Sequence, residues 1–231
     1  MSRDDESRTY KWDTKAPSDP SAEGGAPVPE RKPAPDLAGL LERGRVALLA
    51  WLPADPGSPV QVADLGSADG KLAALVLQSY PAATVTLVDS PQRMMEQCAQ
   101  LLAGFEDRFS YVSWHPEDGD WPDSLKGPFD AIISTAAIHH LVHERKRWLA
   151  ATALERLTDG GFYADFDLFR HPQAQFTEAT PAEIHNGACA TLGETGQFLI
   201  DAGFHDVHVR VRSARPAHKG ELALIVGRKT A

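Results

Sequence analysis

An acidic residue and a glycine-spaced turn follow an apolar run early in the chain. Residues 62–70 read Val-Ala-Asp-Leu-Gly-Ser-Ala-Asp-Gly, so that Asp64 lies just before the turn. Small residues such as Gly66 and Gly70 let the main chain pass close to a ligand before a helix begins. The pattern therefore predicts a first strand followed by a nucleotide-binding loop, with an ordinary strand-to-helix turn as the alternative.

A second carboxylate, Asp89, closes the next apolar run, residues 84–88. At the carboxyl end of a neighbouring parallel strand, a carboxylate can accept hydrogen bonds from both hydroxyl groups of a ribose. Ser90 and Pro91 follow as an N-cap and first helical residue, so the start of a helix shares this rim. We therefore expect Asp89 to contact the ligand.

These features resemble those of class I S-adenosylmethionine-dependent methyltransferases. The first motif of that family is an acidic residue followed by Gly-x-Gly-x-Gly, and Ala68 stands here where the middle glycine would be. Residues 129–134, 137–141 and 159–162 resemble the fourth strand, its following turn and the glycine pair before the fifth strand. The resemblance covers residues 37–229 and implies that S-adenosylmethionine is the cofactor.

The resemblance also implies a set of cofactor-binding residues near the carboxyl ends of the first four strands. They are Asp64, Gly66, Ser67, Ala68, Gly70, Asp89, Ser90, Met94, Asp118, Ser134 and Thr135. Met94 has core packing as its alternative role, because methionine fills gaps well. The family places a carboxylate directly after the third strand, but here Trp114 and His115 occupy that position. Asp118 is therefore the predicted adenine contact, with stacking on Trp114 as the alternative.

Three histidines follow the predicted fourth strand, at whose carboxyl end the crevice of such a sheet opens. A neutral imidazole near pH 7 suits a general base, so we predict His140 near the transferred methyl group, with His139 and Asp167 as further catalytic residues. A buried, hydrogen-bonded His140 is the alternative. A metal site is not expected, because neighbouring histidines point apart on a helix and a fourth ligand is missing.

The expected elements alternate between strands and helices. Helices are predicted from residue 37 to Pro53, after Ser90, over 143–157 and up to Ala202, and strands over 59–65, 84–88, 110–114, 130–135, 162–166, 206–212 and 221–227. This order predicts an α/β fold: a Rossmann-like, seven-stranded, mostly parallel sheet with helices on both faces and an antiparallel C-terminal edge hairpin.

The composition favours one folded domain and a tail. A chain of 231 residues with 42% hydrophobic content can bury one α/β core, which we assign to residues 37–231. Residues 1–36 are rich in polar residues, Pro and Gly and are expected to be a flexible tail. Tyr10 and Trp12 make this tail a candidate lid, with a solvated leader as the alternative. Residues 172–191 are expected to form a loop that helps to close the substrate pocket.

The net charge and the cysteine content limit which binding partners and which cellular compartment are expected. A net charge of -9 and a pI near 5.4 argue against a broad electrostatic surface for nucleic acid. Two cysteines without metal or disulfide spacing, no signal-peptide pattern and no apolar run of about 20 residues predict a cytoplasmic protein without a membrane span. Either a monomer or a homodimer is compatible with the sequence.

The predicted function is methyl transfer from S-adenosylmethionine to an oxygen, nitrogen or carbon atom of a small molecule. Short connections between the fourth, fifth and sixth strands leave room only for a shallow acceptor pocket. Two alternatives stay open, because a fold does not by itself imply a function. One is intramolecular cyclisation of the cofactor with release of methylthioadenosine, and the other is a non-catalytic, cofactor-binding partner.

Overall fold

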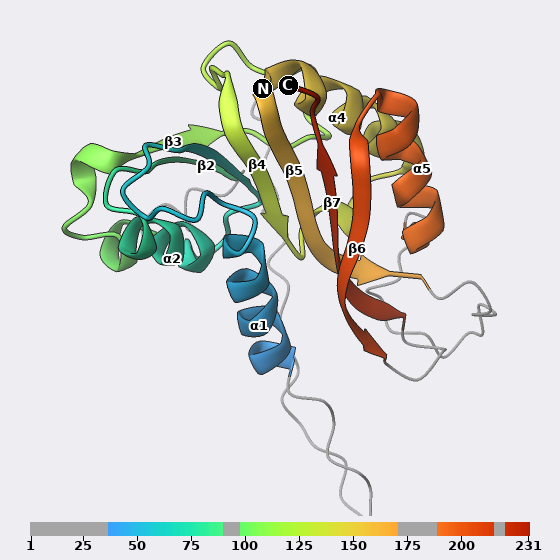
Figure 1. Ribbon diagram of the computed structural model, residues 1–231, viewed down its shortest axis with the longest axis horizontal. Helices are drawn as coiled ribbons and strands as arrows, with labels where there is room; N and C mark the ends of the chain where they lie inside the picture. The colour runs from blue at the N-terminus through green and yellow to red at the C-terminus, as the bar shows by residue number, and fades with distance from the viewer. Residues whose placement is uncertain (1–36, 90–97, 171–188, 215–219) are drawn as a thin grey trace, which may run out of the picture. The chain divides into compact units, whose positions relative to one another are not determined.

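The computed structural model describes residues 37–89, 98–170, 189–214 and 220–231. The predicted tail, Ser90, Met94 and most of the predicted loop at 172–191 lie outside the described residues. Within residues 35–231, which form one unit, the predicted fold class is confirmed: seven strands form one sheet with helices on both faces (Figure 1).

The sheet has the strand order β3-β2-β1-β4-β5-β7-β6. Its strands are β1 (Gln61–Leu65), β2 (Thr84–Asp89), β3 (Phe109–Ser113), β4 (Phe129–Thr135), β5 (Leu157–Phe169), β6 (His205–Ala214) and β7 (Glu221–Arg228). The first five strands are parallel, whereas β7 runs antiparallel between β5 and β6. The predicted C-terminal hairpin is therefore confirmed, with β6 at the edge.

The helices form two layers because each carries an apolar stripe that a sheet face covers. The helices are α1 (Leu37–Leu49), α2 (Lys71–Ser79), α4 (His143–Arg156) and α5 (Leu192–Ala202). Leu48 of α1 and Val76 of α2 are buried in the core on one face, and Leu149 of α4 and Leu199 of α5 in the core on the other. Helices thus cover both faces of the sheet. The edge formed by the carboxyl ends of the parallel strands is where a ligand can bind.

Local capping explains where α5 begins and ends. The side chain of Thr191 accepts a hydrogen bond from the backbone N–H of Glu194, whose carboxylate in turn accepts one from the N–H of Thr191. This is a capping box. Gly203 ends the helix with a φ of 102°, a conformation that glycine adopts without strain. The predicted end at Ala202 is confirmed.

The predicted bounds of one element were wrong. The fifth strand was predicted over 162–166 but extends over Leu157–Phe169, because β7 pairs with it from Phe162 to Phe169. Asp165 and Asp167 therefore lie within the strand, and Asp167 follows directly after the pairing of Phe166 with Thr135 at the carboxyl end of β4.

Candidate active site

The glycine loop lies across the end of β2 and against the segment that follows β4. The backbone N–H groups of Gly66 and Ser67 both donate to the carbonyl of Val88, at 2.8 and 3.1 Å. Gly66 has a φ of +74°, and a Cβ added there would lie 2.2 Å from the Cβ of Ala137. Glycine is therefore required at this position both by conformation and by space. Gly70 caps α2 with a φ of 75°.

Asp89 is held against this loop at the carboxyl end of β2. Its Oδ2 accepts a hydrogen bond of 2.8 Å from the backbone N–H of Ala68, a non-glycine residue with a φ of 46°. The hydroxyl of Tyr111 in β3 donates to the main-chain carbonyl of Asp89 at 3.0 Å. Both ends of the residue are thus fixed, and the half-buried carboxylate faces the loop that was predicted to bind the cofactor.

Several buried polar atoms gather at the ends of β1 and β4. Leu65 pairs with Ser134 across these strands, so the residues around them share one edge of the sheet. Four side-chain oxygens here have no hydrogen-bond partner among the described residues: Asp64 Oδ2, Ser67 Oγ, Ser134 Oγ and Thr135 Oγ1. Leaving such atoms without a partner costs about 1–3 kcal/mol each. The edge therefore has the properties of a site for a polar ligand.

Asp64 is the most strongly perturbed of these groups. Burial raises the pKa of its carboxyl from 3.8 to about 7; the nearby Arg45 opposes this shift, and Asp89 adds to it. The carboxyl group of the ligand-free protein is therefore mainly protonated below about pH 7 and mainly charged above it. A cationic ligand group would favour the charged form instead.

This pKa makes the stability of the ligand-free protein pH-dependent. Because the folded-state pKa is raised, the contribution of Asp64 is largest below pH 3.8 and falls as the pH rises to about 7. At about 1.4 kcal/mol per pKa unit, the loss approaches about 4 kcal/mol. We expect Asp64→Asn to unfold like the parent in urea at pH 4 but to be several kcal/mol more stable at pH 8. Parallel pH curves for the two proteins would contradict this.

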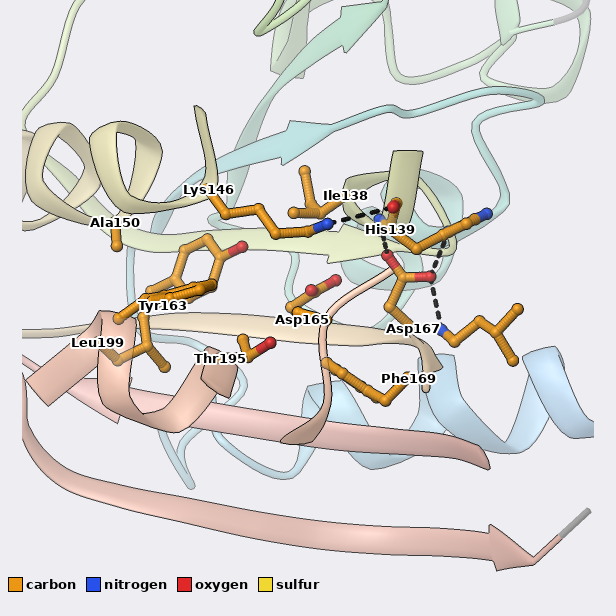
Figure 2. Close-up of a pocket in the computed structure, with 13 residues that line it drawn as sticks. Ile138, His139, Lys146, Ala150, Tyr163, Asp165, Asp167, Phe169, Thr195 and Leu199 are labelled. Atoms are coloured by element: carbon orange, nitrogen blue, oxygen red, sulfur yellow. Dashed lines mark hydrogen bonds and ion pairs between the residues drawn. The ribbon is translucent and has the colours of Figure 1, made fainter. Parts of the chain in front are cut away.

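A histidine and an aspartate form a dyad beside the loop. Nδ1 of His139, in the one-turn 3-10 helix η2 (Ile138–His140), lies 2.6 Å from Oδ1 of Asp167 in β5. Asp167 also accepts hydrogen bonds from the backbone N–H groups of His139 and Leu168, at 2.8 and 2.7 Å. Donors therefore surround this buried carboxylate. Figure 2 shows the two side chains pointing toward each other.

His139 and His140 were expected to point apart, but their side chains lie together. The rings of His139 and His140 lie with their centroids 3.8 Å apart, because η2 is a single tight turn and not part of a regular helix. Both line a cavity of about 200 Å³. Its other lining residues are apolar: Leu37, Leu41, Ala136, Leu168 and Leu222.

The predicted adenine contacts lie in different surroundings. Asp118 is exposed, and its Oδ2 accepts a hydrogen bond from the backbone N–H of His115 at 3.1 Å. Trp114 is buried, with ring centroids 5.5 Å from Trp121 and 6.3 Å from Trp148. Its ring is therefore part of the core beside α4. In the part of the chain that the structure describes, no group of three or more His, Cys, Asp or Glu residues is arranged to hold a metal ion.

Two buried residues with ionisable side chains lie behind the dyad, and sequence reasoning missed one of them, Lys146. Lys146 of α4 is 7% exposed and Asp165 of β5 is 2% exposed. A signal for Lys146 was present, since it occupies the same helix face as the buried residues Leu149, Ala150 and Ala153. A lysine within an apolar stripe indicates a specific partner.

Comparison with known proteins agrees with this geometry. Residues 63–163 match a family model described as a methyltransferase domain. The chain is 31% identical over 135 residues to trans-aconitate 2-methyltransferase of Streptomyces coelicolor, covering 55% of this chain and 41% of that protein. It is 30% identical over 166 residues to ribosomal RNA small subunit methyltransferase C of Pseudomonas aeruginosa, covering 70% and 46%. The chain thus spans less than half the length of either relative.

The fold is shared with solved methyltransferase structures. Human N-acetylserotonin methyltransferase in complex with SAM superimposes with a TM-score of 0.58 at 18% identity, over 84% of this chain and 54% of that one. The chain is thus similar to a methyltransferase domain over residues 63–163 and shares the fold of these structures. Among its described helices, none has the length and apolar character needed to cross a membrane.

Proposed function

We propose that the protein is an S-adenosylmethionine-dependent methyltransferase whose acceptor is a small molecule with a removable proton. The observation that carries this proposal is the His139–Asp167 dyad at a cavity of about 200 Å³. The dyad lies close in the chain to Ala137, which contacts the glycine loop at Gly66. A base, an acceptor pocket and a cofactor loop thus meet at one edge of the sheet.

The residues at this edge fit the cofactor. The carboxylate of Asp89 suits the ribose hydroxyl groups, and the buried Asp64 suits the cationic amino group of the methionine part. The unsatisfied hydroxyl groups of Ser134 and Thr135 would complete the polar contacts. When bound, S-adenosylmethionine supplies a methyl group on an electrophilic sulfonium. The protein then has to align the acceptor, exclude water and accept a proton.

The dyad determines which nitrogen of His139 accepts that proton. Asp167 receives two backbone N–H donors and is therefore an acceptor toward Nδ1 as well. With its proton on Nδ1, His139 keeps Nε2 as the basic nitrogen. Such a base serves an acceptor hydroxyl or amine group, whereas an ionised carboxylate has no proton to lose. The apolar lining of the pocket by Leu41, Leu168 and Leu222 favours an acceptor with an apolar body.

The alternative is a nucleic-acid substrate, because one relative is named as a ribosomal RNA methyltransferase. Nucleic-acid binding depends on a clustered positive surface that neutralises phosphates. This chain has a net charge of -9, and the candidate acceptor pocket is lined by apolar residues and histidines. The net charge and the pocket lining thus both support a small acceptor. We place its methylation in the cytoplasm.

The function is tested by incubating the full chain with S-adenosylmethionine and pooled metabolites, followed by mass spectrometry. We expect S-adenosylhomocysteine together with one species heavier by a methyl group. Methylthioadenosine as the product would establish cyclisation instead. Tight cofactor binding without turnover of any acceptor would indicate a non-catalytic binding partner.

A further inference from the structure

The side chain of Lys146 reaches from α4 to the turn that carries the dyad. Its Nζ donates to the main-chain carbonyl of His139 at 3.1 Å and also to that of Leu141. These two carbonyls lie at the last turn of η2 and just beyond it. Figure 2 shows the lysine lying along the pocket wall with its amino group toward His139. The helix is thereby connected to the main chain at the proposed base.

Two hydrogen bonds from Lys146 connect α4 to η2 and to the residue that follows it. Closure of η2 on itself is a 3.1 Å hydrogen bond from the N–H of Leu141 to the carbonyl of Ile138. A single 3-10 turn has poor hydrogen-bond geometry and little stability of its own. Lys146, which donates to the carbonyls of His139 and Leu141, therefore holds the turn from outside, together with Asp167, which accepts the N–H of His139. Charge-assisted hydrogen bonds of this kind are the stronger ones.

Core packing does not explain a lysine at this position. Burial lowers the pKa of the Lys146 ammonium, whereas the nearby Cys189, Asp167 and Asp165 oppose that shift. Burial, and then the charge of Asp167, raises the pKa of Asp165 well above its usual range. Lys146 thus lies near two buried carboxyl groups, those of Asp165 and Asp167. An apolar residue on the same helix face would avoid the desolvation cost altogether.

A small cavity adjoins this cluster. It has a volume of about 20 Å³ and is lined by Lys146, Asp165, Thr195 and the dyad residues His139 and Asp167. Oδ1 of Asp165 and Oγ1 of Thr195 have no hydrogen-bond partner among the described residues. An arginine at position 146 could therefore place the additional atoms of its guanidinium group in this polar cavity.

We propose that Lys146 is a positioning residue that holds η2 so that His139 keeps Nδ1 on Asp167 and presents Nε2 to the acceptor pocket. The catalytic part of this inference rests on the proposed function. The positional part concerns only the described contacts between α4, η2 and β5. It is therefore testable in the protein without a known acceptor.

The test compares Lys146→Met with Arg147→Met, which removes the same charge from the neighbouring, exposed position of the same helix. Nitrogen-15 NMR of labelled histidine reports the tautomer of His139, assigned by its loss in His139→Gln. We expect the Nδ1–H form in the parent and in Arg147→Met, and a mixture of tautomers in Lys146→Met. Affinity for S-adenosylhomocysteine should stay within about 2-fold, since Asp89 and the loop are not altered.

Turnover provides the second readout once an acceptor is known. A displacement of the base of about 1 Å costs about 100-fold in rate, so kcat of Lys146→Met should fall by that order while KM for the cofactor is kept. Lys146→Arg retains a cationic donor and should recover most of the loss. If Lys146→Met fails to fold, Lys146→Gln and Lys146→Arg carry the same comparison between a neutral and a cationic donor.

A parent-like His139 tautomer in the folded Met variant, or in the Gln variant if Met does not fold, would overturn the proposal. Parent-like kcat in that variant would do the same. A lower melting temperature with unchanged tautomer and kcat would make Lys146 a structural residue only. The absence of turnover in the parent with every acceptor would count against the proposed function alone, because the NMR comparison does not depend on catalysis.

Discussion

Replacement of His139 by alanine is expected to lower kcat about 100- to 10,000-fold at saturating cofactor, the range that a positioned general base contributes. The reason is its geometry: Nδ1 lies 2.6 Å from Oδ1 of Asp167, and the side chain is only 11% exposed. Initial rates with the acceptor identified by mass spectrometry measure the effect. Cofactor affinity should change little, because the proposed cofactor contacts come from other residues, on the glycine loop, β2 and β4.

His140→Ala is the matched control for this experiment. His140 lines the same cavity and its ring lies against that of His139, but the bond to Asp167 belongs to His139. We therefore expect His140→Ala to raise KM for the acceptor more than it lowers kcat. Full activity of His139→Ala together with loss of activity in His140→Ala would return the base to His140, the residue that the sequence analysis favoured.

Replacement of Asp89 by alanine is expected to weaken cofactor binding roughly 10- to 150-fold for each hydrogen bond lost, because bonds to a charged acceptor contribute about 1.5–3 kcal/mol. Calorimetric titration with S-adenosylmethionine gives the ratio of dissociation constants directly. The half-buried carboxylate contributes little packing, so the ligand-free variant should melt within a few degrees of the parent.

Asp89→Asn separates the ribose contact from the support of the loop. Oδ2 of Asp89 accepts the N–H of Ala68 at 2.8 Å, and an asparagine oxygen can still accept that bond. Its amide nitrogen cannot accept a hydrogen bond from a hydroxyl group. We therefore expect the Asn variant to keep the parent's melting temperature and still lose affinity. Parent-like affinity in both variants would remove Asp89 from the site.

Cofactor-site predictions came from features that are local in the sequence. Gly66 and Gly70 both have positive φ values, and the loop begins where an apolar strand ends. Such backbone requirements act within a few residues and leave a pattern of residue types. The alternation of strands and helices and the C-terminal hairpin also follow from local periodicity and from the close spacing of the last two strands. Their bounds shifted where pairing with a neighbour, as between β5 and β7, extended a strand.

The catalytic candidates show where sequence reasoning stops. Sequence alone determined that histidines and acidic residues gather near the ends of the fourth and fifth strands, and it favoured His140 as the base, with His139 and Asp167 as further catalytic residues. The choice of His139 required tertiary structure, because its partner is 28 residues away and is brought near only by the parallel pairing of β4 with β5. Lys146 acts on the same turn from a third element. Contacts of this kind depend on register and helix packing, and no local pattern of residues encodes them.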